Sequence, residues 1–197
     1  MGMKRLFDVL SSMFALVLLA PAMMVVALAV AGGSEGGAFF KQVRVGKQGK
    51  PFQLLKFRTM RLGSEARGQL TVGGRDPRIT RIGHFLRRTK LDELPQLLNV
   101  LRGEMSIVGP RPEVPKYVAL YTPEQRVVLQ VRPGLSSLAS MEYINENEVL
   151  GRSNDPEGTY VHEVMPAKLH LDLKYVREQS LALDLRIIFG TLTKLFG

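Results

Sequence analysis

The first long hydrophobic segment of the chain carries no charge. Residues 9–31 contain no charged side chain, and Lys4 and Arg5 precede them. About 20 apolar residues are enough for a helix that crosses a bilayer, so this segment predicts a membrane helix. Pro21 lies near its middle, where proline removes a backbone hydrogen bond and bends the helix.

Three interpretations of this segment compete. A signal peptide has a shorter apolar core followed by a cleavage site. A straight span would place the cations between residues 41 and 50 on the side opposite the N-terminal cations, which the positive-inside rule disfavours. A re-entrant hairpin at residues 1–34, with its bend at Ala20 and Pro21, keeps both cationic flanks in the cytoplasm. We favour the hairpin, followed by one integrated, membrane-associated cytoplasmic domain at residues 35–197.

Beyond this segment, short apolar runs alternate with polar turns. Residues 39–45 and 51–60 predict two strands of a β-hairpin, joined by a turn at residues 46–50. Lys56 and Arg58 then share one strand face, because side chains alternate at period two along a strand. Two cations on one face suit a diphosphate, but a solvated strand face explains them equally well.

The second half of the chain shows mainly helical signals. The expected helices cover residues 91–101, 114–117, 123–131, 166–178 and 180–196. Residues 61–75 form a glycine-rich polar stretch that predicts a mobile loop, and residues 135–160 predict a second loop. The apolar stripe of the last helix fits either a core helix or an interfacial amphipathic helix. Together these elements predict a mostly helical α+β fold with one small β-hairpin.

Composition limits the classes of protein that this chain can belong to. Its 197 residues are 45% hydrophobic, enough for one domain with a core. The chain has no cysteine, which excludes disulfides and thiolate metal sites. Its formal net charge of +9 predicts an anionic partner, which can be nucleic acid, an acidic membrane surface or a phosphorylated substrate. The three histidines, at positions 84, 162 and 170, lack the spacing of metal ligands.

Residues 89–113 combine an acidic pair with a rigidly placed arginine. Asp92 and Glu93 are adjacent at the start of a leucine-rich helix, about 100° apart around its axis. Only one of them can therefore point straight at a given atom. Prolines on both sides of Arg111 fix the backbone around it. Asp92 also fits a helix cap, and this structural interpretation is the more common one for such a residue taken alone.

Four motifs extend over nearly the whole chain. They are K-F-R-T-M at residues 56–60, L-D-E-L-P-Q-L-L-N-V-L-R-G-E-M-S-I-V-G-P-R-P at 91–112, R-P-G at 132–134 and L-D-L-R-I-I-F at 183–189. With the basic start and the proline in the membrane segment, the chain resembles the bacterial sugar transferases that are monotopic polyprenyl-phosphate phosphoglycosyl transferases. The central motif is long and specific.

This resemblance implies a ping-pong reaction. Asp92 would attack the β-phosphorus of a UDP-sugar, UMP would leave, and the phosphosugar would pass from Asp92 to polyprenyl (undecaprenyl) phosphate. The reaction would be the first membrane step of glycoconjugate assembly. The resemblance also implies assistance from Glu93 and a Mg²⁺ ion held at Asp92. Phosphate contacts are expected from four cations: Lys56, Arg58, Arg87 and Arg111.

Elementary chemistry agrees with this reaction. A carboxylate attacks phosphorus to give a reactive acyl phosphate, and a hard cation with nearby arginines offsets the repulsion between two anions.

The expected partners are a UDP-sugar, a polyprenyl phosphate and anionic membrane lipids, without nucleic acid, and a homo-oligomer is compatible with the sequence. The expected location is the bacterial inner membrane, with a monotopic chain whose catalytic domain lies on the cytoplasmic face.

Two departures from the family pattern affect what the resemblance implies. Family members often carry Ser-Pro at the hairpin bend, where this chain has Ala20 and Pro21. Many members continue R-P-G with I-T-G-W-A-Q-V-N-G-R, whereas residues 135–144 here read L-S-S-L-A-S-M-E-Y-I. Sugar contacts in that loop therefore do not carry over, and the identity of the donor sugar stays open.

A rival interpretation is a non-catalytic membrane-surface protein whose basic face binds anionic lipid or nucleic acid. Only the net charge supports it, because the sequence contains neither an aromatic stacking platform nor a recognised nucleic-acid motif. Release of UMP from a UDP-sugar would separate the two interpretations.

Overall fold

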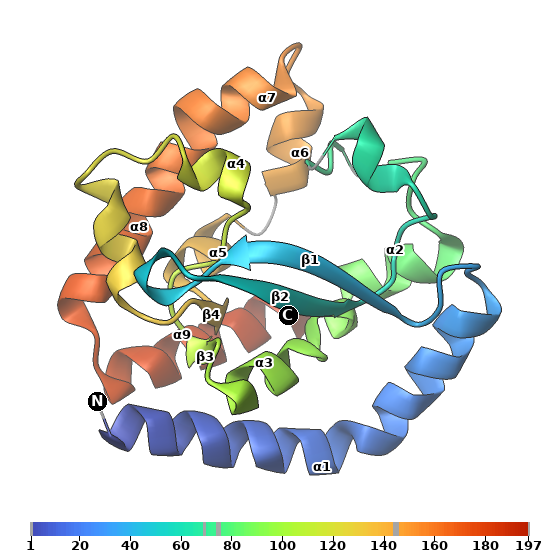
Figure 1. Ribbon diagram of the computed structural model, residues 1–197, viewed down its shortest axis with the longest axis horizontal. Helices are drawn as coiled ribbons and strands as arrows, with labels where there is room; N and C mark the ends of the chain where they lie inside the picture. Colours follow the sequence, from blue (N-terminus) through green and yellow to red (C-terminus); the bar gives the residue numbers. More distant parts are fainter. Residues whose placement is uncertain (1, 69, 74–75, 144–145, 197) are drawn as a thin grey trace.

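The computed structural model describes residues 2–68, 70–73, 76–143 and 146–196. Its first element is the long helix α1 (Gly2–Gly32), which runs along one edge of the fold and bends in its second half (Figure 1). The helix continues through Pro21 and does not break into two helices. One lost backbone hydrogen bond bends a helix without ending it when the neighbouring turns remain bonded.

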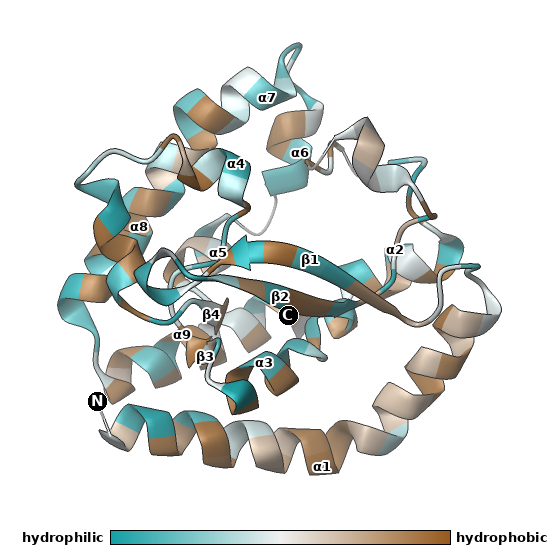
Figure 2. Cartoon of the chain, viewed as in Figure 1, coloured by the Kyte–Doolittle hydropathy of each residue, from teal (hydrophilic) through white to brown (hydrophobic). Residues whose placement is uncertain are grey.

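Helix α1 is long and apolar enough to cross a membrane, and little of it is buried. Figure 2 shows most of its residues in the hydrophobic half of the colour scale. Its exposed large apolar side chains include Leu6, Leu10, Phe14, Val17, Leu18, Met24, Val25 and Leu28. A contiguous apolar surface of this kind marks a contact with a membrane or another protein.

The N-terminal half of α1 is attached to the domain by polar contacts. Lys4 Nζ lies 2.6 Å from Asp184 Oδ2. Asp8 is buried, and its Oδ1 accepts hydrogen bonds from Ser106 Oγ at 3.0 Å and from Ile107 N at 3.1 Å. The beginning of α1 is therefore fixed to the strand at residues 106–108.

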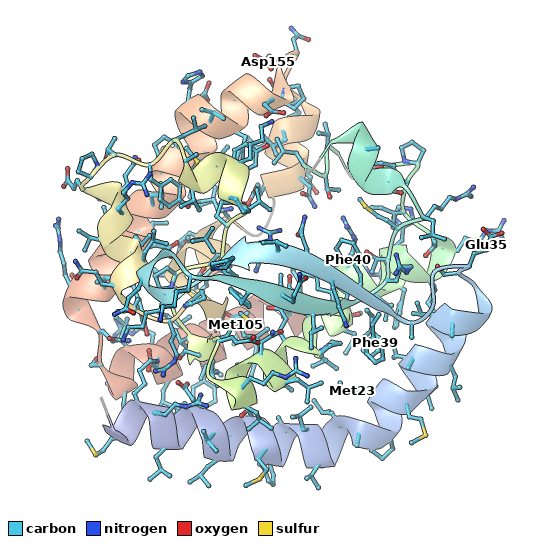
Figure 3. All side chains as sticks on the ribbon, viewed as in Figure 1. Met23, Glu35, Phe39, Phe40, Met105 and Asp155 are labelled. Carbon is cyan, nitrogen blue, oxygen red and sulfur yellow. The ribbon has the colours of Figure 1, made fainter. Side chains whose placement is uncertain are left out.

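The C-terminal end of α1 is attached to the same domain by apolar contacts. Val30 is buried in one cluster with Phe57 and Leu86. Met23 packs against this cluster from the inner side of the bend (Figure 3). Both ends of α1 therefore contact one globular domain.

The described part of the chain forms two small two-stranded sheets. Strands β1 (Phe39–Val45) and β2 (Pro51–Phe57) form the predicted antiparallel hairpin. Strand β2 ends three residues earlier than expected. Strands β3 (Ser106–Val108) and β4 (Gly134–Ser136) pair in parallel.

The parallel pair explains why two motifs contain glycine. A Cβ atom on Gly134 would lie 2.1 Å from Gly109 N, so the two backbones approach too closely for any side chain there. Gly109 N donates to Ser136 O at 3.0 Å, and Gly134 N donates to Pro110 O at 2.9 Å. These contacts fix the backbone that leads into Arg111.

Helices surround the two sheets (Figure 1). After α1 they are α2 (Arg81–Arg88), α3 (Gln96–Arg102), α4 (Pro115–Val118), α5 (Leu138–Glu142), α6 (Glu146–Gly151), α7 (Pro156–Thr159), α8 (Met165–Glu178) and α9 (Leu181–Phe196). Short 3-10 helices occupy Lys47–Gly49, Ser64–Arg67, Leu91–Glu93 and Gln125–Gln130, and a π-helix occupies Tyr160–Val164. The mostly helical α+β class is confirmed.

The expectation of a loop at residues 135–160 is wrong, because helices α5, α6 and α7 lie in this range. Polar side chains in this range cap two of these helices. Ser137 accepts a hydrogen bond from Ser140 N at the start of α5, and Asp155 accepts one from Gly158 N at the start of α7. Residues 144 and 145, and residues 69, 74 and 75 of the predicted mobile loop, lie outside the described residues.

Candidate active site

The acidic pair lies on a single 3-10 turn between α2 and α3. Lys90 adopts a left-handed conformation (φ 56°), which ends α2 and turns the chain into Leu91–Glu93. Asp92 and Glu93 are both buried. Asp92 does not cap a helix, so the capping interpretation is wrong: Pro95 occupies the N-cap position of α3. The predicted helix from residue 91 instead begins as this tight turn.

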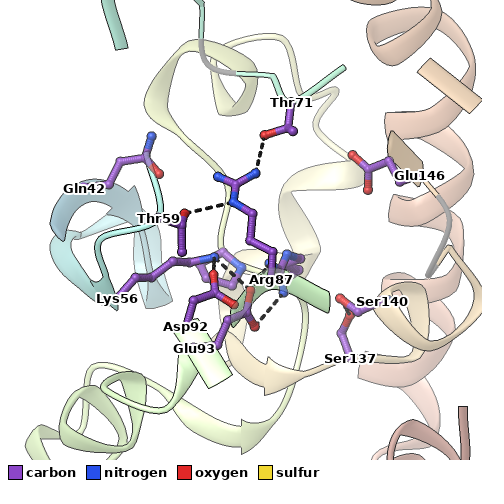
Figure 4. A network of polar contacts seen from close by, with 12 residues as sticks. Gln42, Lys56, Thr59, Thr71, Arg87, Asp92, Glu93, Ser137, Ser140 and Glu146 are labelled. Carbon is purple, nitrogen blue, oxygen red and sulfur yellow. Dashed lines mark hydrogen bonds and ion pairs between the residues drawn. The ribbon is translucent and has the colours of Figure 1, made fainter. Parts of the chain in front are cut away.

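Glu93 binds two cations. Its Oε1 accepts hydrogen bonds from Lys56 Nζ at 2.8 Å and from Arg111 Nη2 at 2.7 Å (Figure 4). Burial alone would raise the pKa of Glu93, but the Arg111 guanidinium and the Lys56 ammonium outweigh it and hold that pKa well below its usual range. Glu93 is therefore ionised, and it holds both cations in place.

Asp92 has a different environment from its neighbour. Its Oδ2 lies 4.0 Å from Lys56 Nζ, and its buried Oδ1 has no hydrogen-bond partner among the described residues. Burial raises the pKa of Asp92 and outweighs the opposing effect of Lys56, and the negative charge of Glu93 raises it further. A buried polar atom without a hydrogen-bond partner lowers the stability of the fold. Oδ1 of Asp92 is therefore available to accept a contact from a ligand.

Arg87 reaches the site from the last turn of α2. Its Nε donates to Thr59 Oγ1 at 2.9 Å, and its Nη1 donates to Thr71 Oγ1 at 2.8 Å (Figure 4). Burial lowers the pKa of Arg87, and the negative charge of Asp92 offsets only part of this effect. The threonines thus hold a guanidinium close enough to the acidic pair for electrostatic interaction.

Arg58 is oriented differently from the other predicted cations. Its Nη2 donates to Phe39 O at 2.9 Å and its Nε donates to Gly37 O at 3.2 Å. The structure therefore brings Asp92 close to Glu93, Lys56, Arg87 and Arg111. Arg58 instead donates hydrogen bonds to backbone oxygens at the start of β1 and in the turn before it. Because β2 ends at Phe57, strand alternation does not extend to Arg58.

A cavity of about 1230 Å³ adjoins this cluster. It is bounded by the β1–β2 hairpin, the acidic turn, the Arg111 loop and residues of α5 and α6. Arg58 also lines it, as do Leu19 of α1 and Leu192 of α9. Its volume exceeds the usual range for small-molecule pockets, so it can hold a large polar ligand that extends to the apolar edge of the molecule.

Comparison with known protein families identifies the family to which this chain belongs. The family model described as bacterial sugar transferase matches residues 1–197. The chain belongs to the bacterial sugar transferase family. It is therefore a transferase enzyme.

Curated relatives support the same assignment. The UDP-glucose:undecaprenyl-phosphate glucose-1-phosphate transferase of Caulobacter vibrioides is 38% identical over 98% of this chain and 69% of its own length. The exopolysaccharide production protein PSS of Rhizobium leguminosarum bv. phaseoli is 43% identical over 96% of this chain and 92% of its length. A UDP-N-acetylgalactosamine-undecaprenyl-phosphate N-acetylgalactosaminephosphotransferase of Aeromonas hydrophila is 36% identical over 96% of this chain but only 42% of its length.

The transferase also contains site residues that sequence reasoning missed. Thr59 lies inside the K-F-R-T-M motif, so its position was a usable signal. Thr71 lies in a polar glycine-rich stretch, where nothing distinguishes it. Glu146 and Lys168 line the cavity from α6 and α8 and form an ion pair, and neither belongs to a motif of the sequence.

Asp172 of the transferase is a buried carboxyl group behind the Arg111 loop. Burial raises its pKa to about 7, although Lys168 and the backbone N–H groups of Arg111 and Ala139 lower it. An unfolded aspartate ionises near pH 4. The folded state thus holds this proton more tightly, and the contribution of Asp172 to stability is lost as pH rises from about 4 to about 7.

Replacing Asp172 by asparagine is expected to remove this dependence. The free energy of unfolding of the variant, relative to the native protein, should increase between pH 4.5 and pH 7.5, by at most about 4 kcal/mol. Chemical unfolding in detergent at both pH values measures the difference. An equal difference at the two pH values would contradict the assignment.

Proposed function

We propose that the protein transfers a sugar phosphate from a UDP-sugar to undecaprenyl phosphate and releases UMP, through a covalent intermediate on Asp92. The unpartnered buried oxygen of Asp92, beside the ion-paired Glu93, is the observation that carries this proposal. The relatives named for glucose-phosphate and N-acetylgalactosamine-phosphate transfer support the choice of substrates.

The chemistry consists of two displacements at one phosphorus atom. In the first, an Asp92 carboxylate oxygen bonds to the β-phosphorus, the bond from that phosphorus to the bridging oxygen breaks, and UMP leaves with that oxygen. In the second, a phosphate oxygen of the acceptor bonds to the same phosphorus and Asp92 is regenerated. An acyl phosphate is reactive enough for the second displacement.

The neighbouring residues serve this reaction electrostatically. Attack by a carboxylate on a diphosphate brings negative charges together, so preorganised cations lower the barrier. Glu93 fixes Lys56 and Arg111 by contacts of 2.8 and 2.7 Å. Arg87 is held by its two threonines. These side chains thus need little reorganisation when the phosphates arrive.

The residues of this site are compatible with Mg²⁺. The described residues contain no cluster of three or more metal-binding side chains. Mg²⁺ does not need one, because it is commonly bound by one or two carboxylates together with substrate phosphates and water. Asp92 offers a free oxygen, whereas Glu93 already binds cations, so we assign the metal contact to Asp92. A bound Mg²⁺ would offset charge on the diphosphate.

We also propose that α1 enters the membrane and returns to the same face, so that the domain lies on the cytoplasmic side of the bacterial inner membrane. The attachment of both ends of α1 to one domain supports this topology, since a straight span would separate them. Helix α9 fits the same surface: its Ile187 is buried, whereas Leu185, Phe189 and Leu192 are exposed. This pattern favours the interfacial interpretation of α9.

Cysteine labelling tests the topology. The chain has no cysteine of its own, so single substitutions Met3→Cys and Lys47→Cys introduce unique labels. In intact spheroplasts, we expect an impermeant maleimide to label neither position until the membrane is permeabilised. Labelling of only one of the two positions in intact spheroplasts would instead establish a straight span.

The function itself is tested by UMP release. Purified protein with Mg²⁺, undecaprenyl phosphate and a panel of UDP-sugars that includes UDP-glucose and UDP-N-acetylgalactosamine should release UMP with at least one donor. Salt-dependent binding to an oligonucleotide, with no UMP from any donor, would instead favour a non-catalytic basic surface protein.

A further inference from the structure

A partly buried ion pair forms part of the cavity wall contributed by α6 and α8. Lys168 Nζ lies 2.6 Å from Glu146 Oε2. Lys168 also lies over the ring of Tyr160, at 5.6 Å from the ring centre, and its side chain is only 10% exposed. In Figure 4 the Glu146 carboxylate points from α6 toward the space between Thr71 and Ser140.

This pair is unsuited to phosphate but suited to a neutral polar group. A carboxylate repels a phosphate, and Lys168 compensates the charge of Glu146 without presenting a net positive site. Carboxylates accept hydrogen bonds from hydroxyl groups, and lysine donates them. Hydrogen bonds to charged groups are stronger than those between neutral groups, so such a pair distinguishes hydroxyl groups by their position.

The pair is also close to the phosphate-binding end of the cavity. Arg111 and Glu146 line the same cavity, and the pKa of Arg111 is raised mainly by Glu93 and to a smaller extent by Glu146. Ser140 lines the same wall. In a nucleotide-sugar the sugar is bonded directly to the β-phosphate, so a ligand with this phosphate near Arg111 places its sugar within reach of α5 and α6.

We infer that Glu146 and Lys168 bind hydroxyl groups of the donor's sugar and determine which sugar is transferred. This inference rests on the proposed function, and it assigns part of the specificity to α6 and α8. The two residues are 22 positions apart in the sequence, and Glu146 lies two positions after residues 135–144, where the sequence departs from the family pattern.

The test compares the native protein with Glu146→Gln across UDP-glucose, UDP-galactose, UDP-N-acetylglucosamine and UDP-N-acetylgalactosamine. The readout is kcat/KM for UMP release with each donor. We expect the ratio between the preferred donor and the others to change by about tenfold or more, because the variant loses a charged acceptor. The affinity for UMP, which lacks the sugar that the donor transfers, should stay within about twofold and is measured by calorimetry.

Two further variants make the outcome decisive. Glu124→Gln removes an exposed carboxylate that pairs with Arg177 and does not line the cavity, and it should change neither readout. Glu146→Asp keeps the charge but shortens the side chain, so it should also alter the donor ratio. It takes the place of Glu146→Gln in the test if Glu146→Gln does not fold.

The outcomes separate the inference from the function on which it rests. An unchanged donor ratio, or an equal loss for every donor together with weaker UMP binding, would overturn the sugar-binding role and leave the transferase function standing. Absence of UMP release from the native protein with every donor would overturn the function, and the inference with it.

Discussion

Asp92→Asn is expected to reduce UMP release by about four orders of magnitude or more, as is typical for loss of a catalytic nucleophile. The amide of asparagine keeps the shape of the side chain but does not attack phosphorus. Because burial raises the pKa of Asp92, ionisation of this residue opposes folding at neutral pH. The variant should therefore be at least as stable as the native protein while it loses activity.

UMP release and thermal unfolding, measured on the same detergent-solubilised samples, check this prediction. Asp155→Asn is a matched control, because Asp155 caps α7 and is not part of the cavity lining. It should keep both its activity and its stability, since asparagine caps a helix about as well as aspartate. Asp92→Asn with native activity would remove Asp92 from the reaction. Asp92→Asn that is inactive and also strongly destabilised would indicate a structural role.

Glu93→Gln is expected to have the opposite effect on stability. The substitution leaves Lys56 and Arg111 without the carboxylate that both contact, and loss of one member of a buried ion pair costs about 3–5 kcal/mol. For a chain of this length, that corresponds to a fall in Tm of roughly 10 °C. UMP release should fall as well, because the two cations no longer have fixed positions.

Thermal unfolding of Glu93→Gln and of the exposed control Glu124→Gln, both against the native protein, measures this difference. The control should unfold within about 1 °C of the native protein, since exposed ion pairs contribute little to stability. A Tm of Glu93→Gln equal to that of the control would show that Glu93 does not hold the two cations. The account thus predicts opposite changes in stability for two adjacent residues: Asp92→Asn should not destabilise the protein, whereas Glu93→Gln should.

Local patterns in the sequence predicted much of this fold. The apolar segment with its proline, the β-hairpin and the last two helices follow from hydrophobic periodicity, and the acidic pair follows from a long motif. The turn geometry at Lys90 does not, because its left-handed backbone is rare for lysine. Periodicity alone therefore extended the helix of residues 91–101 too far toward its N-terminus.

The parts of the site that were missed depend on contacts between distant segments. Thr71 meets Arg87 across 16 positions, and Glu146 meets Lys168 across 22. A single sequence gives no signal for such pairs. Arg58 lies in the right motif and lines the cavity, and its guanidinium donates hydrogen bonds to the backbone of Gly37 and Phe39.

Lys4 illustrates how one feature has two explanations. The positive-inside rule interprets it as a topology signal, whereas the structure pairs it with Asp184 of α9. Asp184 also accepts a hydrogen bond from Tyr175 of α8 at 2.7 Å. The L-D-L-R motif near the C-terminus therefore contains a residue that joins α1, α8 and α9.

The most direct measurement is mass spectrometry of the protein after brief exposure to the correct UDP-sugar and Mg²⁺ without an acceptor lipid. The account predicts a burst of UMP of no more than one equivalent and a sugar-phosphate mass on the peptide that contains Asp92. Addition of undecaprenyl phosphate should remove that mass. Release of UMP during turnover with position 92 unmodified at every time point would contradict a covalent intermediate on Asp92.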